Sequence, residues 1–519
     1  MAGKRRVVET GKKNVLQIVF GRTMSIIVLL ALHFLLTFAL FLEFTSYIPI
    51  YIGGTTALMA VMLTVILNTR DNPALKLSWC TLVAISPVFG TMLYFFVRFD
   101  VGHRVFGRAI ERSIAESRQH TPDQQPTLEK IKREEPDFYG TAYYLNKHAG
   151  LGICAADEVR YLPVGEAMLE QMLLELEKAE KFIFLEYFII EQGKMWGQIL
   201  EILERKAREG VEVRVLYDGT CSLLKLPASY PKTLEKKGIR CKLFSPLQPF
   251  VSTHYNNRDH RKILVVDGVT AMTGGINLAD EYINHTHPFG HWKDTAVLVR
   301  GQAARSFTQM FLQMWNALEK EREYEKYLPP MVPAAEGRGY VIPYGDSPTD
   351  KENVGEMVYL NMLNQAKDYV YIMTPYLILD NEMVTALCLC AKRGVDVRLV
   401  QPQVPDHKYA YVLARRHYKE LMEAGVKIYA YIPGFVHAKV FLADDTQAVV
   451  GTINLDYRSL YLHYECAALL YKVPAIGDIR RDFDNIFSLS KCLDRQDLRR
   501  ESLLSRLAGV LLKVVAPLM

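Results

Sequence analysis

Two copies of one short pattern of histidine, lysine and aspartate contain the residue types best suited to chemistry. The pattern is H-x-K-x4-D, and its defined positions are His260, Lys262, Asp267, His437, Lys439 and Asp444. Each copy is followed by G-x-I-N-L, which places Asn277 and Asn454 at the same distance from their histidines. One motif could arise by chance, but two copies with the same continuation are far rarer. The repetition therefore predicts a composite site built from both copies.

This combination of side chains suits a transfer reaction at phosphorus. In an extended strand, residues two apart point to the same face, so each histidine is presented together with its lysine. Lysine and asparagine side chains would hold the phosphate oxygens and stabilise a five-coordinate transition state. One histidine would attack phosphorus to give a phosphohistidine, while the other protonates the leaving alcohol. The lysines supply the positive charge, so we expect neither a metal ion nor another cofactor.

A carboxylate behind each histidine would fix its tautomer, as the aspartate does in a Ser-His-Asp triad. The candidates are Asp294 and Glu465, because each leads into an apolar strand of its half. We expect one of them to support each motif histidine.

The segments around the motifs repeat an order of strand, helix and strand, which is typical of a βαβ unit. This order occurs over residues 182–190, 198–208 and 210–216, and again over 369–373, a helix through Ala391, and 394–400. We therefore predict an α/β protein of two similar halves, residues 136–330 and 331–500, each with a mainly parallel sheet between helices. Residues 99–135 are charged and contain prolines, so we expect a linker with a surface helix there.

The N-terminal 98 residues predict a membrane anchor. Three runs carry no charged residue and are long enough to cross a hydrocarbon core about 30 Å thick: residues 24–42, 44–67 and 77–97. A cleaved signal peptide is disfavoured, because no small-residue cleavage site follows the first run. Basic residues flank both ends of the block, which places both ends in the cytoplasm. Pro87 and Gly90 weaken a helix in the third run, so we predict two transmembrane helices plus a re-entrant or interfacial segment, rather than three spans.

Composition narrows the remaining possibilities. The net charge is only +5 and half of the residues are hydrophobic, which argues against disorder and gives no support to nucleic-acid binding. Among the eight cysteines only Cys388 and Cys390 lie close together, in a spacing that is typical of neither a zinc site nor a redox pair. Residues 501–519 predict an apolar C-terminal helix that could pack in a core, on another domain or on a membrane surface.

The paired motifs resemble those of the phospholipase D superfamily, and the resemblance covers residues from about 140 to 495. The apolar N-terminus, the stretch from Asn72 to Trp79, and the Leu-rich C-terminus are similar to those of bacterial cardiolipin synthases. This resemblance implies two pseudo-symmetric α/β/α halves behind an α-helical membrane anchor. It also implies phosphatidyl transfer between two phosphatidylglycerol molecules at the bilayer, which gives cardiolipin and glycerol.

The resemblance implies roles for individual residues as well. We predict that His260 is the nucleophile and that His437, supported by Glu465, is the acid and base. The family pattern makes all six defined motif positions active-site residues, Asp267 and Asp444 included, and within that set we give these two aspartates a positioning role. The second half continues as G-x-x-N-x-D-x-R-S, whereas the first half departs from this pattern after its asparagine, so the two phosphate cradles differ chemically.

Other activities of the same superfamily remain open from the motifs alone. A hydrolytic phospholipase D and a phosphatidylserine-forming transferase differ from the predicted enzyme only in the acceptor. A nuclease would need a basic groove and has little use for a membrane anchor. A non-catalytic scaffold would not need two intact motifs. We therefore expect a multi-pass enzyme of the cell membrane with its catalytic halves in the cytoplasm.

Overall fold

A computed structural model describes residues 48–98, 101–221, 225–245, 257–328, 339–350, 352–499 and 501–518, together with Ala31, Leu35 and Phe38. The chain divides into two compact units. The helical unit comprises residues 1–105, 247–255 and 513–519, and the α/β unit comprises residues 106–246 and 256–512. Each is described by itself.

Three helices make up the described core of the helical unit: α3 (Ile48–Leu67), α4 (Pro73–Ile85) and α5 (Pro87–Arg98). They pack through a small apolar cluster that includes Met62, Trp79 and Tyr94. The helix is interrupted between α4 and α5 at Ser86, as expected from the proline that follows this residue. A side chain at Gly90 would lie 2.8 Å from the Leu82 carbonyl oxygen, so glycine is needed where α5 approaches α4.

No helix within the described part of the chain combines the length and the apolarity needed to cross a membrane. The first predicted span, residues 24–42, lies outside the described residues except for three isolated positions.

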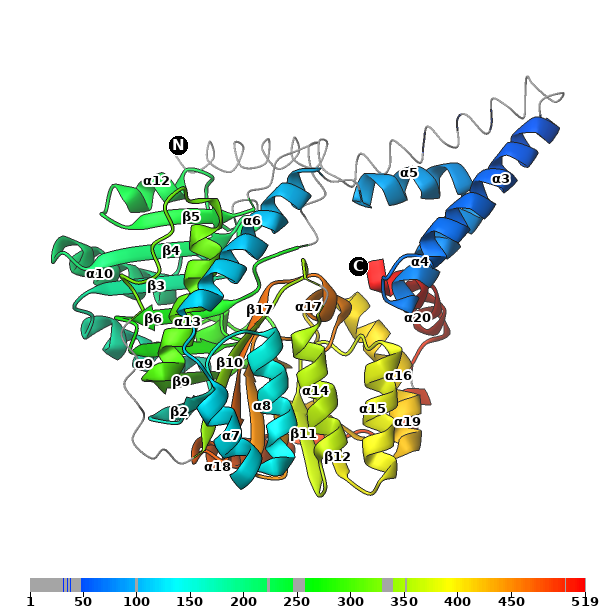
Figure 1. Cartoon of the computed structure of the whole chain (residues 1–519). Helices are drawn as coiled ribbons and strands as arrows, with labels where there is room; N and C mark the ends of the chain where they lie inside the picture. The colour runs from blue at the N-terminus through cyan, green and yellow to red at the C-terminus, as the bar shows by residue number, and fades with distance from the viewer. Residues whose placement is uncertain are drawn as a thin grey trace, which may run out of the picture. The chain divides into compact units, whose positions relative to one another are not determined.

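The first half of the α/β unit contains a seven-stranded sheet. Its strands in spatial order are β2 (Val159–Leu162), β9 (Ala296–Arg300), β7 (Thr270–Gly274), β6 (Lys262–Val266), β3 (Phe182–Tyr187), β4 (Glu212–Asp218) and β5 (Arg240–Phe244). The outer face is covered by α9 (Gly165–Glu177), α10 (Lys194–Arg208) and α12 (Tyr230–Glu235), as Figure 1 shows.

The second half contains a nine-stranded sheet built on the same plan. Its strands in spatial order are β1 (Cys154–Ala155), β10 (Tyr340–Asp346), β17 (Glu465–Tyr471), β16 (Gln447–Gly451), β15 (Val440–Ala443), β11 (Tyr369–Met373), β12 (Asp396–Pro402), β13 (Lys427–Tyr431) and β18 (Ser490–Cys492). Its outer face is covered by α14 (Val354–Gln365), α15 (Asn381–Lys392) and α16 (Lys408–Ala424) (Figure 1).

One apolar core lies between the two sheets and holds the halves together. Strand β6 illustrates why the motif strands are apolar after the motif lysine: Ile263 and Val265 face this shared core, while Leu264 and Val266 face the helices outside. Both faces of a central strand are buried, so alternation of polar and apolar residues is lost. The helices α13 (Gln302–Trp315) and α18 (Ala475–Ser488) contribute to the same shared core.

The sheets are mixed, which corrects the prediction of mainly parallel sheets. The predicted βαβ units give the parallel strands β3-β4-β5 and β11-β12-β13. The motif strands β6 and β15 instead begin antiparallel hairpins with β7 and β16. Asp267, Gly268, Asp444 and Asp445 have positive φ angles in these three-residue hairpin loops, as the two central positions of a type I′ turn require.

The linker and the start of the first half also differ from the prediction. Residues 99–135 contain α6 (Val101–Ser117) and α7 (Gln125–Glu134), and Leu128 and Ile131 of α7 are buried in the core of the second half. Helix α8 (Pro136–His148) packs beside α14 (Figure 1), and β1 pairs with β10. The chain from residue 125 to 155 therefore belongs structurally to the second half.

Candidate active site

The two motif histidines lie at the interface between the halves. Each precedes its strand, β6 or β15, and each backbone N–H donates to a carbonyl of the opposite half. His260 donates to Tyr464 over 3.0 Å, and His437 donates to Lys293 over 2.7 Å. Strand β8 (His291–Lys293) also pairs in parallel with β14 (Gly434–Val436), which leads directly into His437. The halves are therefore joined by backbone hydrogen bonds at the two histidines.

Each histidine is supported by the carboxylate of the opposite half. The Nδ1 atom of His260 lies 2.9 Å from Oε1 of Glu465, and Nδ1 of His437 lies 2.7 Å from Oδ2 of Asp294. Both predicted carboxylates are thus at the site, but the pairing of His437 with Glu465 was wrong. The backbone pairing between the halves is the reason. Asp259, next to His260, forms a bridge with Tyr464, the residue before Glu465. Val436, next to His437, pairs with Lys293, the residue before Asp294.

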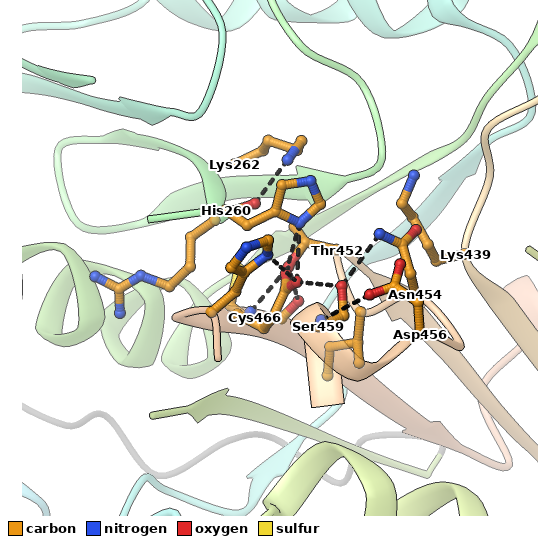
Figure 2. Close-up of polar contacts among 12 residues, drawn as sticks. His260, Lys262, Lys439, Thr452, Asn454, Asp456, Ser459 and Cys466 are labelled. Carbon is orange, nitrogen blue, oxygen red and sulfur yellow. Dashed lines mark hydrogen bonds and ion pairs between the residues drawn. The ribbon is translucent and has the colours of Figure 1, made fainter. Parts of the chain in front are cut away.

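The motif lysines are buried beside the histidines. Lys262 Nζ donates to the His260 carbonyl oxygen over 2.6 Å, and Lys439 Nζ lies 2.9 Å from Nδ1 and 3.1 Å from Nε2 of His437. Figure 2 shows His260 and Lys262 of the first half together with Lys439 of the second half. Burial lowers the pKa of Lys262 to about 8 and that of Lys439 to about 7. Two cations held out of water in this way favour an anionic ligand.

Both imidazoles are neutral in this environment. Burial, followed by the nearby lysines, lowers the pKa of His260 well below its usual value and that of His437 to about 4. A neutral imidazole keeps the lone pair that a nucleophile or a general base needs. An arriving phosphodiester brings negative charge, which offsets the lysines and makes protonation of a histidine easier.

The two carboxylates have different surroundings. Burial raises the pKa of Glu465 to about 7. Glu465 also accepts hydrogen bonds from the hydroxyl groups of Thr452 and Ser459. Burial alone would raise the pKa of Asp294 too, but His437 and Lys439 hold it below its usual value. Asp294 therefore stays ionised near neutral pH, whereas Glu465 is partly protonated.

A glycine explains the different carboxylates. Gly275 occupies the position in the first half that Thr452 occupies in the second. A Cβ atom at Gly275 would lie 2.1 Å from Oδ1 of Asp294, so no larger residue fits beside that carboxylate. The threonine hydroxyl in the second half instead binds the longer glutamate. The predicted chemical difference between the two halves thus extends to the carboxylates.

The two motif asparagines do not play equal parts. Asn277 accepts from the Ile189 N–H over 3.1 Å and donates to the Tyr282 hydroxyl over 2.7 Å, so both ends of its amide bind the protein. Asn454 donates to Ser459 over 3.1 Å, and its Oδ1 atom has no hydrogen-bond partner among the described residues. The geometry gives Asn277 a scaffolding role and leaves Asn454 available to a ligand.

The motif aspartates lie at the far ends of their strands. Asp267 is seven residues beyond His260, roughly 20 Å along an extended chain. Its carboxylate accepts from three consecutive backbone N–H groups, those of Glu180, Lys181 and Phe182, at 2.7–2.8 Å. Asp444 does the same for residues 367–369. Their positioning role is thus to fix the hairpin against the start of the neighbouring strand.

Sequence reasoning missed one residue of the site. His463 lies two residues before Glu465, and its ring centroid is 5.5 Å from that of His260. The alternation that presents His260 together with Lys262 would have placed His463 on the same face as Glu465.

A search against protein families matches residues 172–315 and 359–487 to the family described as "Cardiolipin synthase, PLD-like domain". The cardiolipin synthase of Geobacillus kaustophilus is 34% identical over 465 residues, which cover 88% of this chain and 91% of that protein. The cardiolipin synthase of Alkalihalophilus pseudofirmus is 34% identical over 427 residues, or 81% of this chain and 84% of that protein.

The chain belongs to the cardiolipin synthase family. It is thus a phosphatidyltransferase of the phospholipase D superfamily, as the paired motifs predicted. An uncharacterized protein of Streptococcus mutans is 50% identical over 454 residues, which cover 88% of this chain and 98% of that protein. The crystal structure of the phosphatidylserine synthase of Haemophilus influenzae Rd KW20 has the same fold, with a TM-score of 0.57 and 15% identity over 72% of this chain and 97% of that one.

Proposed function

We propose that this member of the cardiolipin synthase family joins two phosphatidylglycerol molecules and releases glycerol. The observation that carries the proposal is the pair of histidines at one interface, each held by a buried carboxylate and accompanied by a buried lysine. Such a site binds a phosphodiester through its cations and can act on both sides of phosphorus.

The first step forms a covalent intermediate. Nε2 of His260 attacks phosphorus, and the bond from phosphorus to the glycerol oxygen breaks. His437 takes up a proton when the negatively charged phosphodiester binds and then gives that proton to the glycerol oxygen, so glycerol leaves as a neutral alcohol. Lys262 and Lys439 stabilise the charge on the phosphate oxygens of the transition state.

In the second step His437 acts as a base instead of an acid. His437, now neutral, takes the proton from a hydroxyl of the second phosphatidylglycerol. That oxygen attacks phosphorus, and the bond from phosphorus to His260 breaks, which regenerates the free imidazole. All atoms and protons balance, and the overall reaction is reversible because each bond formed resembles the bond broken.

The unequal carboxylates support His260 as the nucleophile. Asp294 remains ionised and so stabilises the imidazolium that His437 must form as an acid. Glu465 shares its charge with two hydroxyl groups and draws a positive charge onto His260 less strongly, which keeps that imidazole neutral for attack. His437, supported by Asp294, is accordingly the acid and base.

An analysis of the products formed from phosphatidylglycerol alone tests this function. Purified full-length protein is incubated with vesicles of phosphatidylglycerol alone, and the lipids and water-soluble products are identified. Equal amounts of cardiolipin and glycerol are expected. Phosphatidic acid as the main product would indicate a hydrolytic enzyme instead and would refute the proposal.

We also propose that the N-terminal region anchors the enzyme in the cell membrane with the α/β unit in the cytoplasm. Both substrates are lipids, and basic residues flank both ends of the apolar N-terminal block. Protease added outside spheroplasts should leave the chain beyond residue 100 intact. Cleavage in that region from outside would refute this orientation.

A further inference from the structure

His463 is a largely buried imidazole beside the proposed nucleophile, and the proposed reaction gives it no task. Its side chain is 10% exposed, and neither ring nitrogen has a hydrogen-bond partner among the described residues. Its Nδ1 atom lies 3.8 Å from Oε1 of Glu465, which is too far for a hydrogen bond. A buried polar group without a partner is unfavourable, because it has given up its hydrogen bonds to water. A ligand that gave these nitrogens a partner would recover that cost.

His463, His260 and Glu465 form a triangle of possible metal ligands. One ligand atom of each residue lies within 4.8 Å of the other two. Two imidazole nitrogens and one carboxylate oxygen are the protein ligands of some open zinc sites, which keep a fourth position for water. Zinc bonds of about 2.0–2.2 Å place tetrahedral ligands roughly 3.4 Å apart. The His463 ring would therefore have to move by only about an ångström.

The other half lacks this triangle. Trp292 stands two residues before Asp294, as His463 stands two residues before Glu465. Its ring lies 5.6 Å from that of His437, close to the 5.5 Å between His463 and His260. An indole cannot ligate a metal through its N–H group. Within the described part of the chain, this triangle is accordingly the one group of three that could hold a metal ion.

The surroundings select the class of ion. Lys262 and Lys439 lie near this triangle, and their positive charge disfavours an ion that binds mainly through electrostatic attraction to carboxylates. Magnesium and calcium bind through oxygen and need several carboxylates or carbonyls. Zinc and similar transition metals bind imidazole nitrogen strongly and tolerate a single carboxylate.

We propose that His260, His463 and Glu465 form an inhibitory site for zinc or a chemically similar divalent transition metal. Zinc binds Nδ1 of His260 through its lone pair, so the single ring proton of the neutral imidazole moves from Nδ1 to Nε2. A protonated Nε2 has no lone pair and cannot attack phosphorus. The inhibitory consequence rests on the proposed role of His260 as nucleophile, whereas the binding of the metal does not.

Binding and inhibition are measured separately on purified full-length protein in detergent. Every form carries Cys492→Ser, because Cys492 is an exposed thiol that could bind zinc by itself. Cobalt binding is followed by its visible absorption spectrum and zinc affinity by competition. We expect one site per chain and at least a tenfold loss of affinity in His463→Asn.

Three comparisons keep the test decisive. His417→Asn removes a different buried histidine, in α16, and should leave the metal affinity unchanged. His463→Trp copies the residue of the other half, removes the ligand without shrinking the side chain, and replaces the first variant if that one does not fold. Magnesium at millimolar concentration should neither bind nor inhibit.

The possible outcomes separate the two proposals. Micromolar zinc should inhibit the parent protein and inhibit His463→Asn at least tenfold less. Equal zinc affinity in the parent and in both His463 variants would overturn the site. A metal site that depends on His463, in a protein that makes phosphatidic acid rather than cardiolipin, would support the site and refute the proposed function.

Discussion

Replacing Asp294 by asparagine should disable the acid while sparing the nucleophile. Oδ1 of Asp294 accepts the Thr295 N–H over 2.8 Å, and Oδ2 faces Nδ1 of His437 over 2.7 Å. The oxygen of an asparagine at this position would stay with Thr295, so its NH2 group would face His437. That NH2 group donates to Nδ1 and forces the proton onto Nε2. His437 would then be held in the tautomer that cannot act as a base.

The size of the effect follows from these groups. General acid-base catalysis contributes about 10²–10⁴ in rate, and an aspartate-to-asparagine change behind the catalytic histidine of a serine protease costs about 10⁴. We expect Asp294→Asn to lower the turnover of phosphatidylglycerol by about 10³, or roughly 4 kcal/mol. Glu465→Gln should lower it by only about 10–100-fold, because burial already raises the pKa of Glu465 to about 7 and leaves it partly protonated.

The assay compares two donors with different leaving groups. Phosphatidylglycerol releases glycerol and needs the acid, whereas a nitrophenyl phosphatidyl ester releases a stable anion and does not. With the ester, Asp294→Asn should give a burst of nitrophenolate within about tenfold of the wild-type rate, followed by slow turnover. Glu465→Gln should slow the burst itself, since it supports the attacking histidine.

The opposite result would refute the reasoning. A burst lost in Asp294→Asn and retained in Glu465→Gln would make His437 the nucleophile, with the same cross-half pairs. Equal losses with both donors in both variants would mean that the carboxylates do not divide the work.

Three further predictions follow from the site. Replacement of either motif histidine by alanine should abolish transfer. The thermal unfolding midpoint should stay unchanged, because the small polar cavity left by the imidazole admits water. Measurable turnover in either variant would contradict the two-histidine mechanism. Asp267→Ala should lower the free energy of unfolding by about 1–3 kcal/mol, since three N–H groups lose their acceptor, while activity per folded molecule stays within about twofold; chemical unfolding and an active-site titration measure the two effects. Burial lowers the pKa of Lys439 to about 7 and of Lys262 to about 8, so the first charge is lost above about pH 7 and the second above about pH 8. The kcat/KM for the donor lipid should therefore fall from about pH 7 upward, and a profile that stays flat to about pH 9.5 would contradict the role of the lysines.

Much of this protein follows from local patterns in the sequence. The paired motifs identify both histidines and both lysines, because side chains two apart in a strand share a face wherever the strand lies. The βαβ segments and the helix break before Pro87 were predictable for the same reason, since hydrophobic periodicity and the geometry of proline act over a few residues.

Only the tertiary structure decides how the halves meet. Glu465 pairs with His260, and Asp294 with His437, because backbone bridges at Tyr464 and Lys293 set the register between distant segments. Periodicity carries no information about which of two equivalent strands will lie beside a given histidine. The mixed sheets and the role of Asp267 at a hairpin turn depend in the same way on partners far away in the chain, since hydrogen bonds between distant strands form only when the chain has folded.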